Sequence, residues 1–185
     1  FSDVPDAGVA FSLITTSSAE RAKAALDRLE ALAIELRELG QPREWDLDRA
    51  LAEIKTLEGG PYIVVEPADN IGGGAPGDDT AILRGFLRHG IRNAAVAIAD
   101  ADTVKAFADA RPGDVRTVRL GGKGSQLGAG PLEIAATFLS RSDGEFTLED
   151  RNSHLAAMQG VHISMGASVV LEVDGVKILV NSRKT

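Results

Sequence analysis

The sequence predicts an α/β fold of the mixed α+β kind: a mixed sheet with a βαβ unit, followed by an antiparallel, strand-rich region. Two apolar runs, residues 62–66 and 94–99, flank a glycine-rich segment and a helical pattern, which is the order strand, loop, helix, strand. In the residues before position 62, apolar side chains recur mainly every three or four positions, which is the spacing of helices. After Asp114 the runs become β-branched or alternate between apolar and polar residues, which is typical of strands.

The first third of the chain is predicted to hold one short strand and two helices. Residues 8–15 form a short apolar run. Ser17 lies three residues before Glu20, a capping-box spacing that predicts a helix start. Apolar residues then recur every three or four positions, so we expect one buried face, and Gly40 with Pro42 ends this helix. Asp46 is predicted to cap a second helix, which ends at the Gly59-Gly60-Pro61 segment.

The centre of the chain carries the predicted βαβ unit. Residues 62–66 (YIVVE) form an apolar strand, and a helix is expected over residues 78–89 with Gly90 as its stop. Residues 94–99 (AAVAIA) are continuously apolar, the pattern of a strand buried on both faces. A short helix is expected over residues 103–109. Trp45 and the phenylalanines are expected in the core.

Five further strands are predicted after Asp114, over residues 115–120, 132–140, 145–148, 168–173 and 176–181. The pairs Asp143-Gly144 and Asp174-Gly175 are signals for two-residue hairpin turns.

Composition excludes several classes of function. The net charge of -7 disfavours non-specific binding to nucleic acid or to an anionic membrane. With no cysteine, the chain has no disulfide, thiolate zinc site or cysteine nucleophile. No apolar run approaches the roughly 20 residues of a membrane span. We therefore expect a cytoplasmic protein with no nucleic-acid or membrane partner.

Both ends of the sequence look cut. The chain begins at Phe1 without a methionine and stops at Thr185 directly after a strand-like run. These ends favour a fragment or excised domain, and the alternative is a processed or tag-trimmed whole protein.

The segment from Asp69 to Thr80, DNIGGGAPGDDT, is the predicted functional centre. Gly72, Gly74 and Gly77 match the dinucleotide pattern G-x-G-x-x-G literally. Five residues separate the strand from the first glycine, however, and Pro76 occupies a position where the helix should already be donating N–H groups. A nucleotide- or phosphate-binding module is therefore an alternative function rather than the preferred one.

The chemistry of this segment favours a ligand-binding loop. Three consecutive glycines permit close backbone approach, and Asp69, Asn70 and Asp78 add carboxylate and amide groups beside a helix start. The structural alternative is that the glycines merely allow a tight strand-to-helix turn and that Asp78 merely caps the helix.

These residues carry a family resemblance. The run DNIGGGAPGDDTAILRGFL resembles the signature of the carboxy-terminal domain of the microcystinase C (MlrC) family of zinc metallopeptidases. FSDVPDAG, NAAVAIADADTV, LGGKGSQLGAGPLEIAATFLSRSDGEF and VLEVDGVKILVNSRK resemble other parts of that domain, so the resemblance covers essentially the whole chain. Ile71 departs from it, because a proline is expected there.

The resemblance implies that residues 1–185 are one domain of a two-domain zinc peptidase acting on short, linear or linearised peptides, with microcystin degradation as the name-giving activity. The zinc and the catalytic residues would lie on an absent amino-terminal domain, and the extreme carboxy-terminus would also be missing. This chain would be inactive alone. It would have the amino-terminal domain and the peptide as partners, and whether it also forms a homo-oligomer stays open.

In the family, this domain faces the metal across a substrate cleft. Carried over onto this sequence, the motif implies that the residues binding substrate at this cleft are Asp69, Asn70, Gly72, Gly73 and Gly74. Gly77, Asp78 and Thr80 are then expected to organise the loop and the helix start. No catalytic or metal-ligating residue is expected in this chain, and a non-catalytic interaction domain is the second alternative function.

For the histidines and a second glycine-rich loop, the sequence favours a structural role over a functional one. His89 is expected to close a helix, where an imidazolium complements the dipole. His154 and His162 lack the H-E-x-x-H spacing of a zinc site and are expected in a surface loop or a lid over the cleft. Residues 121–125 (GGKGS) form a second glycine-rich loop, more typical of a wide hairpin turn than of a substrate contact.

Overall fold

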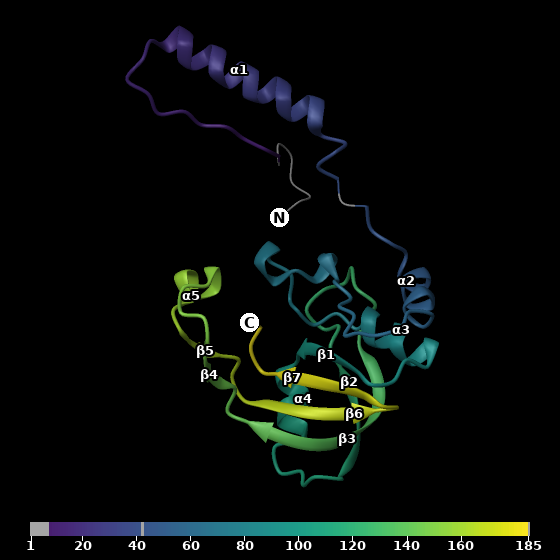
Figure 1. Cartoon of the computed structure of the whole chain (residues 1–185). Helices are drawn as coiled ribbons and strands as arrows, with labels where there is room; N and C mark the ends of the chain where they lie inside the picture. The colour runs from purple at the N-terminus through teal and green to yellow at the C-terminus, as the bar shows by residue number, and fades with distance from the viewer. Residues whose placement is uncertain (1–7, 42, 185) are drawn as a thin grey trace. The chain divides into compact units, whose positions relative to one another are not determined.

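The computed structural model describes residues 8–41 and 43–184. The chain divides into two compact units, a helical unit (Phe1–Trp45) and a sheet unit (Asp46–Thr185), each described here by itself. The sheet unit contains the predicted mixed fold, with five strands in one sheet and helices beside it (Figure 1). Mixed α/β architecture is therefore confirmed.

The helical unit is simpler than the sequence predicts. Its helix α1 spans Ala19–Leu36, and Ser18 rather than Ser17 caps it by accepting from the N–H of Arg21. α1 has no buried residue, so the expected buried face is wrong for the described residues. Residues 8–15 form no strand either, because they have no neighbouring strand in the described chain with which to pair.

The main sheet has the strand order β1-β7-β6-β3-β2. Its members are β1 (Ala94–Ala99), β2 (Val115–Leu120), β3 (Leu132–Ser142), β6 (Ser168–Val173) and β7 (Val176–Asn181). β1 pairs with β7 in parallel, while the three remaining pairs are antiparallel. The β6–β7 hairpin turns at Asp174 and Gly175 with positive φ at both, as the turn signal predicts.

A two-stranded arm leaves the main sheet after β3. It consists of β4 (Glu145–Thr147) and β5 (His162–Ser164), with helix α5 (His154–Gln159) between them. The hairpin expected at Asp143-Gly144 is wrong, because β3 pairs with β6 and β4 pairs with β5. Gly144 instead approaches Gly166 so closely that a Cβ there would lie 2.0 Å from the Gly166 carbonyl oxygen.

Two helices precede the sheet within this unit. α2 (Leu47–Ile54) begins at the predicted cap, where the carboxylate of Asp46 accepts from the N–H of Arg49. α3 (Ala81–His89) ends as predicted at Gly90, which adopts the left-handed conformation. The helices pack closely at Gly85, where a Cβ would lie 2.7 Å from Leu51 Cδ1. α3 starts three residues later than expected, and the side chains of Asp78 and Thr80 bond instead to residues 123–130.

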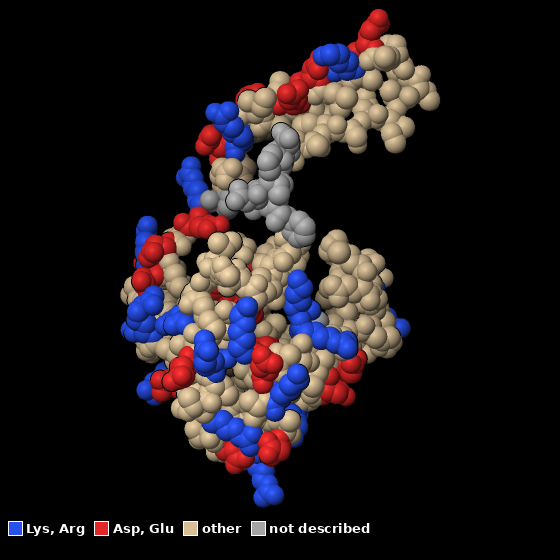
Figure 2. Space-filling model, turned by 180° about the vertical axis from the view of Figure 1, so that it is seen from behind, with Lys and Arg blue, Asp and Glu red and all other residues tan. Residues whose placement is uncertain are grey.

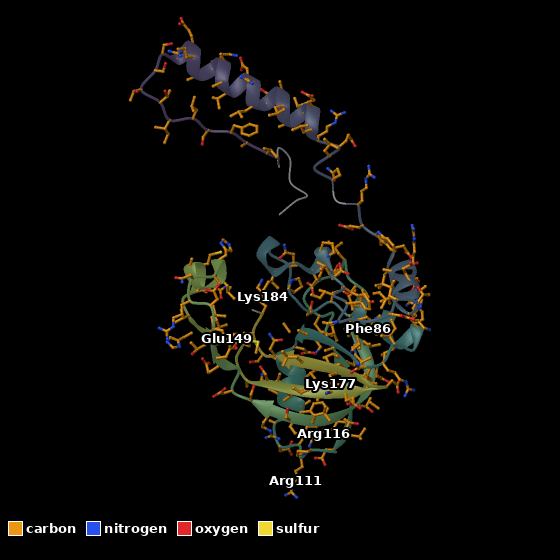
Figure 3. All side chains as sticks on the ribbon, in the orientation of Figure 1. Phe86, Arg111, Arg116, Glu149, Lys177 and Lys184 are labelled. Atoms are coloured by element: carbon orange, nitrogen blue, oxygen red, sulfur yellow. The ribbon has the colours of Figure 1, made fainter. Side chains whose placement is uncertain are left out.

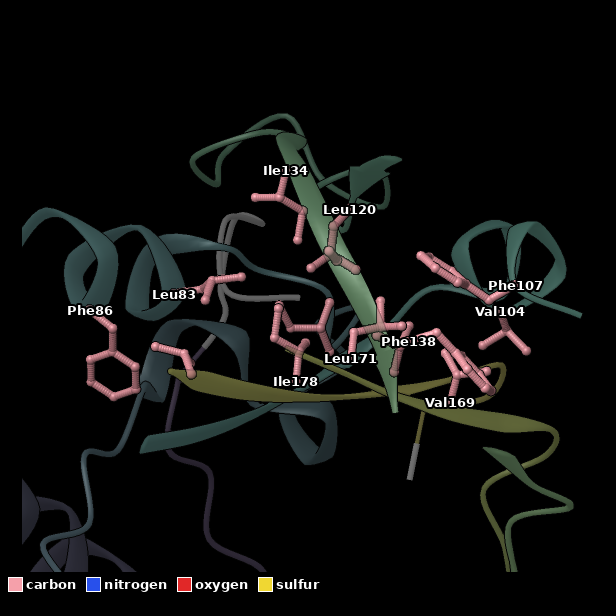
Figure 4. Packing of buried hydrophobic residues seen from close by; sticks show 14 of the residues in the cluster. Leu83, Phe86, Val104, Phe107, Leu120, Ile134, Phe138, Val169, Leu171 and Ile178 are labelled. Atoms are coloured by element: carbon pink, nitrogen blue, oxygen red, sulfur yellow. The ribbon is translucent and has the colours of Figure 1, made fainter. Parts of the chain in front are cut away.

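One face of the main sheet carries the hydrophobic core (Figure 4). Leu83, Ile98, Leu120, Leu171 and Ile178 are fully buried there. Helix α4 (Ala101–Ala106) leads to Phe107, whose ring stacks on that of Phe138 with centroids 6.0 Å apart. The core therefore joins all five strands to the helices that follow the first glycine-rich loop and β1.

Two guanidinium groups cover these rings. Those of Arg116 and Arg141 lie 5.7 Å and 5.1 Å from the ring centroids of Phe107 and Phe138 respectively. Arg116, labelled in Figure 3, also pairs with Asp109 at 2.9 Å. Cation–π contact and ion pairing thus cover the core edge beside α4.

Three expectations about strands and burial are wrong. Residues 62–66 form no strand. β1 is an edge strand on which Ala95 and Ala97 are exposed, not a strand buried on both faces. Trp45 is 56% exposed, and Phe11 and Phe146 are also exposed, whereas Phe86, Phe107 and Phe138 lie in the core. Phe1 falls outside the described residues.

Two surface properties bear on partners. On the face shown in Figure 2, basic and acidic side chains intermingle over the sheet unit, without one large patch of either sign. Among the described residues, no helix combines the length and the apolar character that crossing a bilayer requires.

Candidate functional site

Two glycine-rich loops meet at the carboxyl end of β1. The first loop comprises residues 69–80 and contains η2 (Ile71–Gly73), which follows η1 (Pro67–Asp69). The second loop comprises residues 121–131 and joins the antiparallel strands β2 and β3, as a wide hairpin turn would. Asp100, at the end of β1, lies between them.

Asp69 closes the first loop. Its two carboxylate oxygens accept from the N–H groups of Gly77 at 2.8 Å and Asp79 at 2.7 Å. The Gly77 carbonyl in turn accepts from the N–H of Ala99 on β1 at 2.8 Å. Asp69 was predicted to bind substrate, and the structure gives its carboxylate an organising position within the loop.

Asn70 and the three consecutive glycines form an exposed turn. The Asn70 side-chain oxygen accepts from Gly72 N–H at 3.0 Å, and its backbone oxygen accepts from Gly73 N–H at 2.9 Å. Gly74 N–H donates to the Ile71 carbonyl at 3.1 Å. All three glycine N–H groups are thus used within the loop. Asn70 is exposed, and its side-chain amide nitrogen has no hydrogen-bond partner among the described residues.

Asp78 binds the first loop to the second. One of its carboxylate oxygens accepts from the N–H groups of Lys123 at 2.6 Å and Gly124 at 2.8 Å. Its backbone carbonyl also accepts from Gly122 N–H at 2.6 Å. Asp78 is only 7% exposed, so these bonds replace lost hydration.

Asp100 is the second link between the loops. The Asp100 carboxylate accepts from Gly121 N–H at 2.9 Å and from the Thr103 hydroxyl at 2.7 Å. It also accepts from the Lys123 ammonium, which lies 2.8 Å from each oxygen. Lys123 is therefore fixed at both its backbone and its side chain.

Thr80 ties the start of α3 to the second loop. Its hydroxyl donates to the Gly130 carbonyl at 2.8 Å and accepts from Arg84 Nε at 3.0 Å. Arg84 also donates to the Pro131 carbonyl at 2.7 Å. The side chain of Thr80 makes no helix-capping bond, and its hydroxyl bonds to the second loop instead.

Glycines allow these backbones to approach. Gly77 has φ of +74°, and a Cβ there would lie 2.7 Å from the Ile71 side chain. At Gly122, with φ of +58°, a Cβ would lie 2.1 Å from the Gly130 carbonyl carbon. Both positions therefore require glycine for conformation and for space.

A pocket of about 240 Å³ lies beside the first loop. Asp69, Ile71 and Gly77 line one side, and residues 96–99 of β1 line the other. Glu66, Asp79 and Lys184 place charges around it. The site therefore presents an exposed polar turn next to a small, partly apolar hollow.

The histidines stand apart from this arrangement. His89 is the last residue of α3, as expected, and its imidazole lies 2.8 Å from the Asp48 carboxylate. His154 opens α5, and His162 on β5 contacts the Thr147 hydroxyl at 3.2 Å. No cluster of three or more histidine, cysteine or acidic side chains able to hold a metal occurs within residues 8–41 and 43–184.

The geometry gives little support to phosphate binding. The N–H groups of Gly72 and Gly74 are used inside the loop, and α3 starts only at Ala81. Asp78 and Asp79 lie within three residues of that helix start, and their carboxylates would repel a phosphate. The literal G-x-G-x-x-G pattern thus lacks the strand-turn-helix context that gives it meaning.

Sequence reasoning missed the importance of Asp100 and Lys123. The available signal was the run Asp100-Ala101-Asp102-Thr103 after an apolar strand, which is a helix-cap pattern. Nothing local shows that Asp100 also reaches Gly121 and Lys123, because those contacts span more than twenty residues.

The hydrogen bonds of Asp100 set its titration. Burial is the largest single influence and by itself raises the pKa of Asp100, but bonds from Lys123, Gly121 and Thr103 together outweigh it. The pKa therefore lies below the ordinary value of 3.8.

This shift predicts acid sensitivity. A carboxyl whose pKa is lower in the folded than in the unfolded chain stabilises the fold above its unfolded pKa, near about 4. That stabilisation is lost as the pH falls further, toward the folded pKa. We expect melting curves between about pH 2.5 and pH 6 to show less acid destabilisation in Asp100→Asn than in the unmodified chain. Equal pH dependence in both proteins would contradict this assignment.

Comparison with known proteins gives two matches. The family model described as MlrC C-terminus matches residues 64–185. The fold is similar to the crystal structure of "Putative metallopeptidase from Mesorhizobium sp. BNC1", with a TM-score of 0.71 and 24% identity. That match covers 89% of this chain and 32% of the other, so this chain spans about a third of that protein's length. At this identity the likeness shows the fold alone. No curated protein matches.

Proposed function

Since the chain belongs to the family of MlrC C-terminal domains, we propose that it forms one wall of the substrate cleft of a zinc-dependent peptidase. The substrates are short linear or linearised peptides. The observation that carries the proposal is the exposed Asn70–Gly74 turn. Hydrogen bonds of the Asp69 carboxylate within the first loop, and of the Asp78 carboxylate to the second loop, hold the residues on either side of it. A rigid support under an exposed polar turn suits the positioning of a peptide.

The groups that this turn offers are specific. The N–H groups of Gly72 to Gly74 donate within the loop, whereas the side-chain amide of the exposed Asn70 is a donor with no partner among the described residues. The carbonyl oxygens of Gly72 and Gly73 accept no hydrogen bond among the described residues and serve as acceptors. One donor beside two acceptors matches the alternating groups of a peptide backbone.

Zinc would be held outside this chain. The described residues include no set of side chains that fits a zinc site, so no catalytic step is assigned to a metal here. The role proposed for this chain is to bind and orient the peptide. A partner domain, amino-terminal in the longer protein, would supply the metal and the reacting groups.

Valine at position 73 tests whether the turn contacts substrate. A Cβ at Gly73 would meet only the Asn70 amide nitrogen at 3.9 Å, and Gly73 has ordinary φ, so Gly73→Val should leave the fold intact. In the full-length enzyme we expect kcat/KM on short peptides to fall at least about tenfold, with an unchanged melting temperature. Gly8→Val is the matched control, because a Cβ at Gly8 also has open space.

Activity of the parts tests the division of labour. The 185-residue chain alone should hydrolyse no peptide, whereas the full-length protein should do so and lose activity to a zinc chelator. Hydrolysis by the chain alone that resists the chelator would refute the proposal. Full activity of Gly73→Val in the longer protein would instead favour a non-catalytic interaction domain.

A further inference from the structure

The free edge of β1 borders a wide groove. β1 pairs only with β7, so its other edge has no strand beside it in the described chain. The groove measures about 1120 Å³, with Tyr62, Ile63 and Val64 on one wall and residues 94–97 of β1 on the other. Lys177 of β7, labelled in Figure 3, also lines it. A segment of extended chain thus lies across a groove from an unpaired sheet edge.

Residues 62–66 have the character of a strand that lacks a partner. Their burial alternates: Val64 packs against the core and Glu66 is half-buried, whereas Ile63 is 86% exposed and Val65 is 76% exposed. β-branched residues together with burial that alternates along the chain are typical of a paired strand. The backbone of these residues makes no hydrogen bond to the backbone of another described residue. The segment therefore leaves both its backbone groups and two large apolar side chains open to water.

The topology favours β1 as the missing partner. Residues 67–93 connect the segment to β1 and include α3, which packs against β1. This is the arrangement of a crossover between adjacent parallel strands, which needs about a dozen residues or more. Such crossovers place the two strands side by side in one sheet, with the helix covering one face. Here α3 already covers the core face.

We infer that residues 62–66 are a strap that closes onto the free edge of β1 as a sixth, parallel strand. Closure satisfies the backbone groups of both edges and removes part of Ile63 and Val65 from water. Gly59 and Gly60 precede the strap with φ of +91° and +137°, and no atom lies within 4 Å of a Cβ built at Gly59. The strap therefore has a permissive hinge at its start.

Closure would act on the candidate site. The strap ends at Glu66, which lines the 240 Å³ pocket together with Asp69 and β1. Only Pro67 and Ala68 separate Glu66 from Asp69, the residue that closes the first loop. Movement of the strap toward β1 thus moves the wall of the pocket under the Asn70–Gly74 turn.

Paired cysteines test the closure, because the chain has no native cysteine. Adjacent strands lie about 4.8 Å apart, within the reach of a disulfide. The test pairs are Ile63→Cys with Ala95→Cys and Val65→Cys with Ala97→Cys, all at exposed positions. The control is Val65→Cys with Thr117→Cys on β2, the far edge strand of the sheet. We expect at least one test pair to form an intramolecular disulfide more than about ten times faster than the control.

Test pairs that oxidise no faster than the control, or that form mainly linked dimers, would overturn the inference. Hydrogen exchange of the unmodified chain gives a second readout that does not depend on the variants. Closure predicts protection at alternate amides of residues 62–66, since every second N–H of a strand faces the same neighbour. Unprotected exchange at all five amides would overturn it as well.

Discussion

Replacing Asp100 by alanine is expected to lower the free energy of unfolding by about 3 kcal/mol. The change removes the acceptor for Gly121 N–H and for the Thr103 hydroxyl, both of which are buried bonds. The Lys123 ammonium also loses both of its 2.8 Å contacts with the carboxylate. For a unit of this size the melting temperature should fall by roughly 10 °C. Thermal or urea unfolding of the purified chain measures the loss.

Asp102→Ala is the matched control. Asp102 also lies near the Lys123 ammonium, at 3.7 Å, but its side chain is 75% exposed against 3% for Asp100. Exposed pairs contribute about 0–1 kcal/mol, so this variant should unfold almost as the unmodified chain does. Equal losses from both substitutions would mean that charge near Lys123, rather than the buried hydrogen-bond network, holds the two loops.

Gly122→Ala is the second substitution with a large expected effect, about 3 kcal/mol or more. An added Cβ would lie 2.1 Å from the Gly130 carbonyl carbon and 2.6 Å from the Pro131 nitrogen, both of them backbone atoms. Because backbone cannot rotate away as a side chain can, the two limbs of the second loop must separate. That movement also pulls Gly122 N–H from the Asp78 carbonyl.

Gly113→Ala separates the space effect from the conformational one. Gly113 has φ of +96°, but nothing lies within 4 Å of a Cβ built there. Gly113→Ala should therefore lower the free energy of unfolding only by the backbone strain, about 1 kcal/mol. Unfolding curves of the two variants compare directly. A Gly122→Ala chain no less stable than Gly113→Ala would show that the loop limbs do not pack as described.

The sequence predicted what depends on local chemistry. The cap at Asp46, the stop at Gly90 and the turn at Asp174-Gly175 are all confirmed, because each is decided by residues within one turn of backbone. The strand at residues 94–99 is also confirmed, and here β7 supplies the parallel partner that the strand needs.

The errors arise where a partner element decides the outcome. Residues 8–15 and 62–66 have strand-like composition, yet a strand exists only when another strand pairs with it. The turn signal at Asp143-Gly144 forms no hairpin, because β3 and β4 pair with different strands. Trp45 was expected in the core because of its residue type, and residue type alone does not determine burial.

In the candidate site, too, the sequence revealed the features that depend on neighbouring residues and missed those that depend on distant ones. The glycine-rich segment was visible in the sequence, and the structure places the Thr80 hydroxyl on the Gly130 carbonyl and Gly77 against the Ile71 side chain. The link from Asp100 to the second loop was not visible, because it joins residues 21 positions apart. Asp69 was predicted as a substrate contact, whereas its carboxylate binds two backbone N–H groups of its own loop.

The most direct test of the peptide-cleft proposal is kcat/KM of Asn70→Asp in the full-length enzyme, measured beside its melting temperature. The Asn70 side-chain oxygen accepts from Gly72 N–H at 3.0 Å. Aspartate keeps such an oxygen but lacks the amide donor. We predict a fall in kcat/KM of at least about tenfold on short peptides, with a melting temperature within about 2 °C of the unmodified enzyme. Unchanged kcat/KM with the same stability would contradict the claim that this turn binds the peptide.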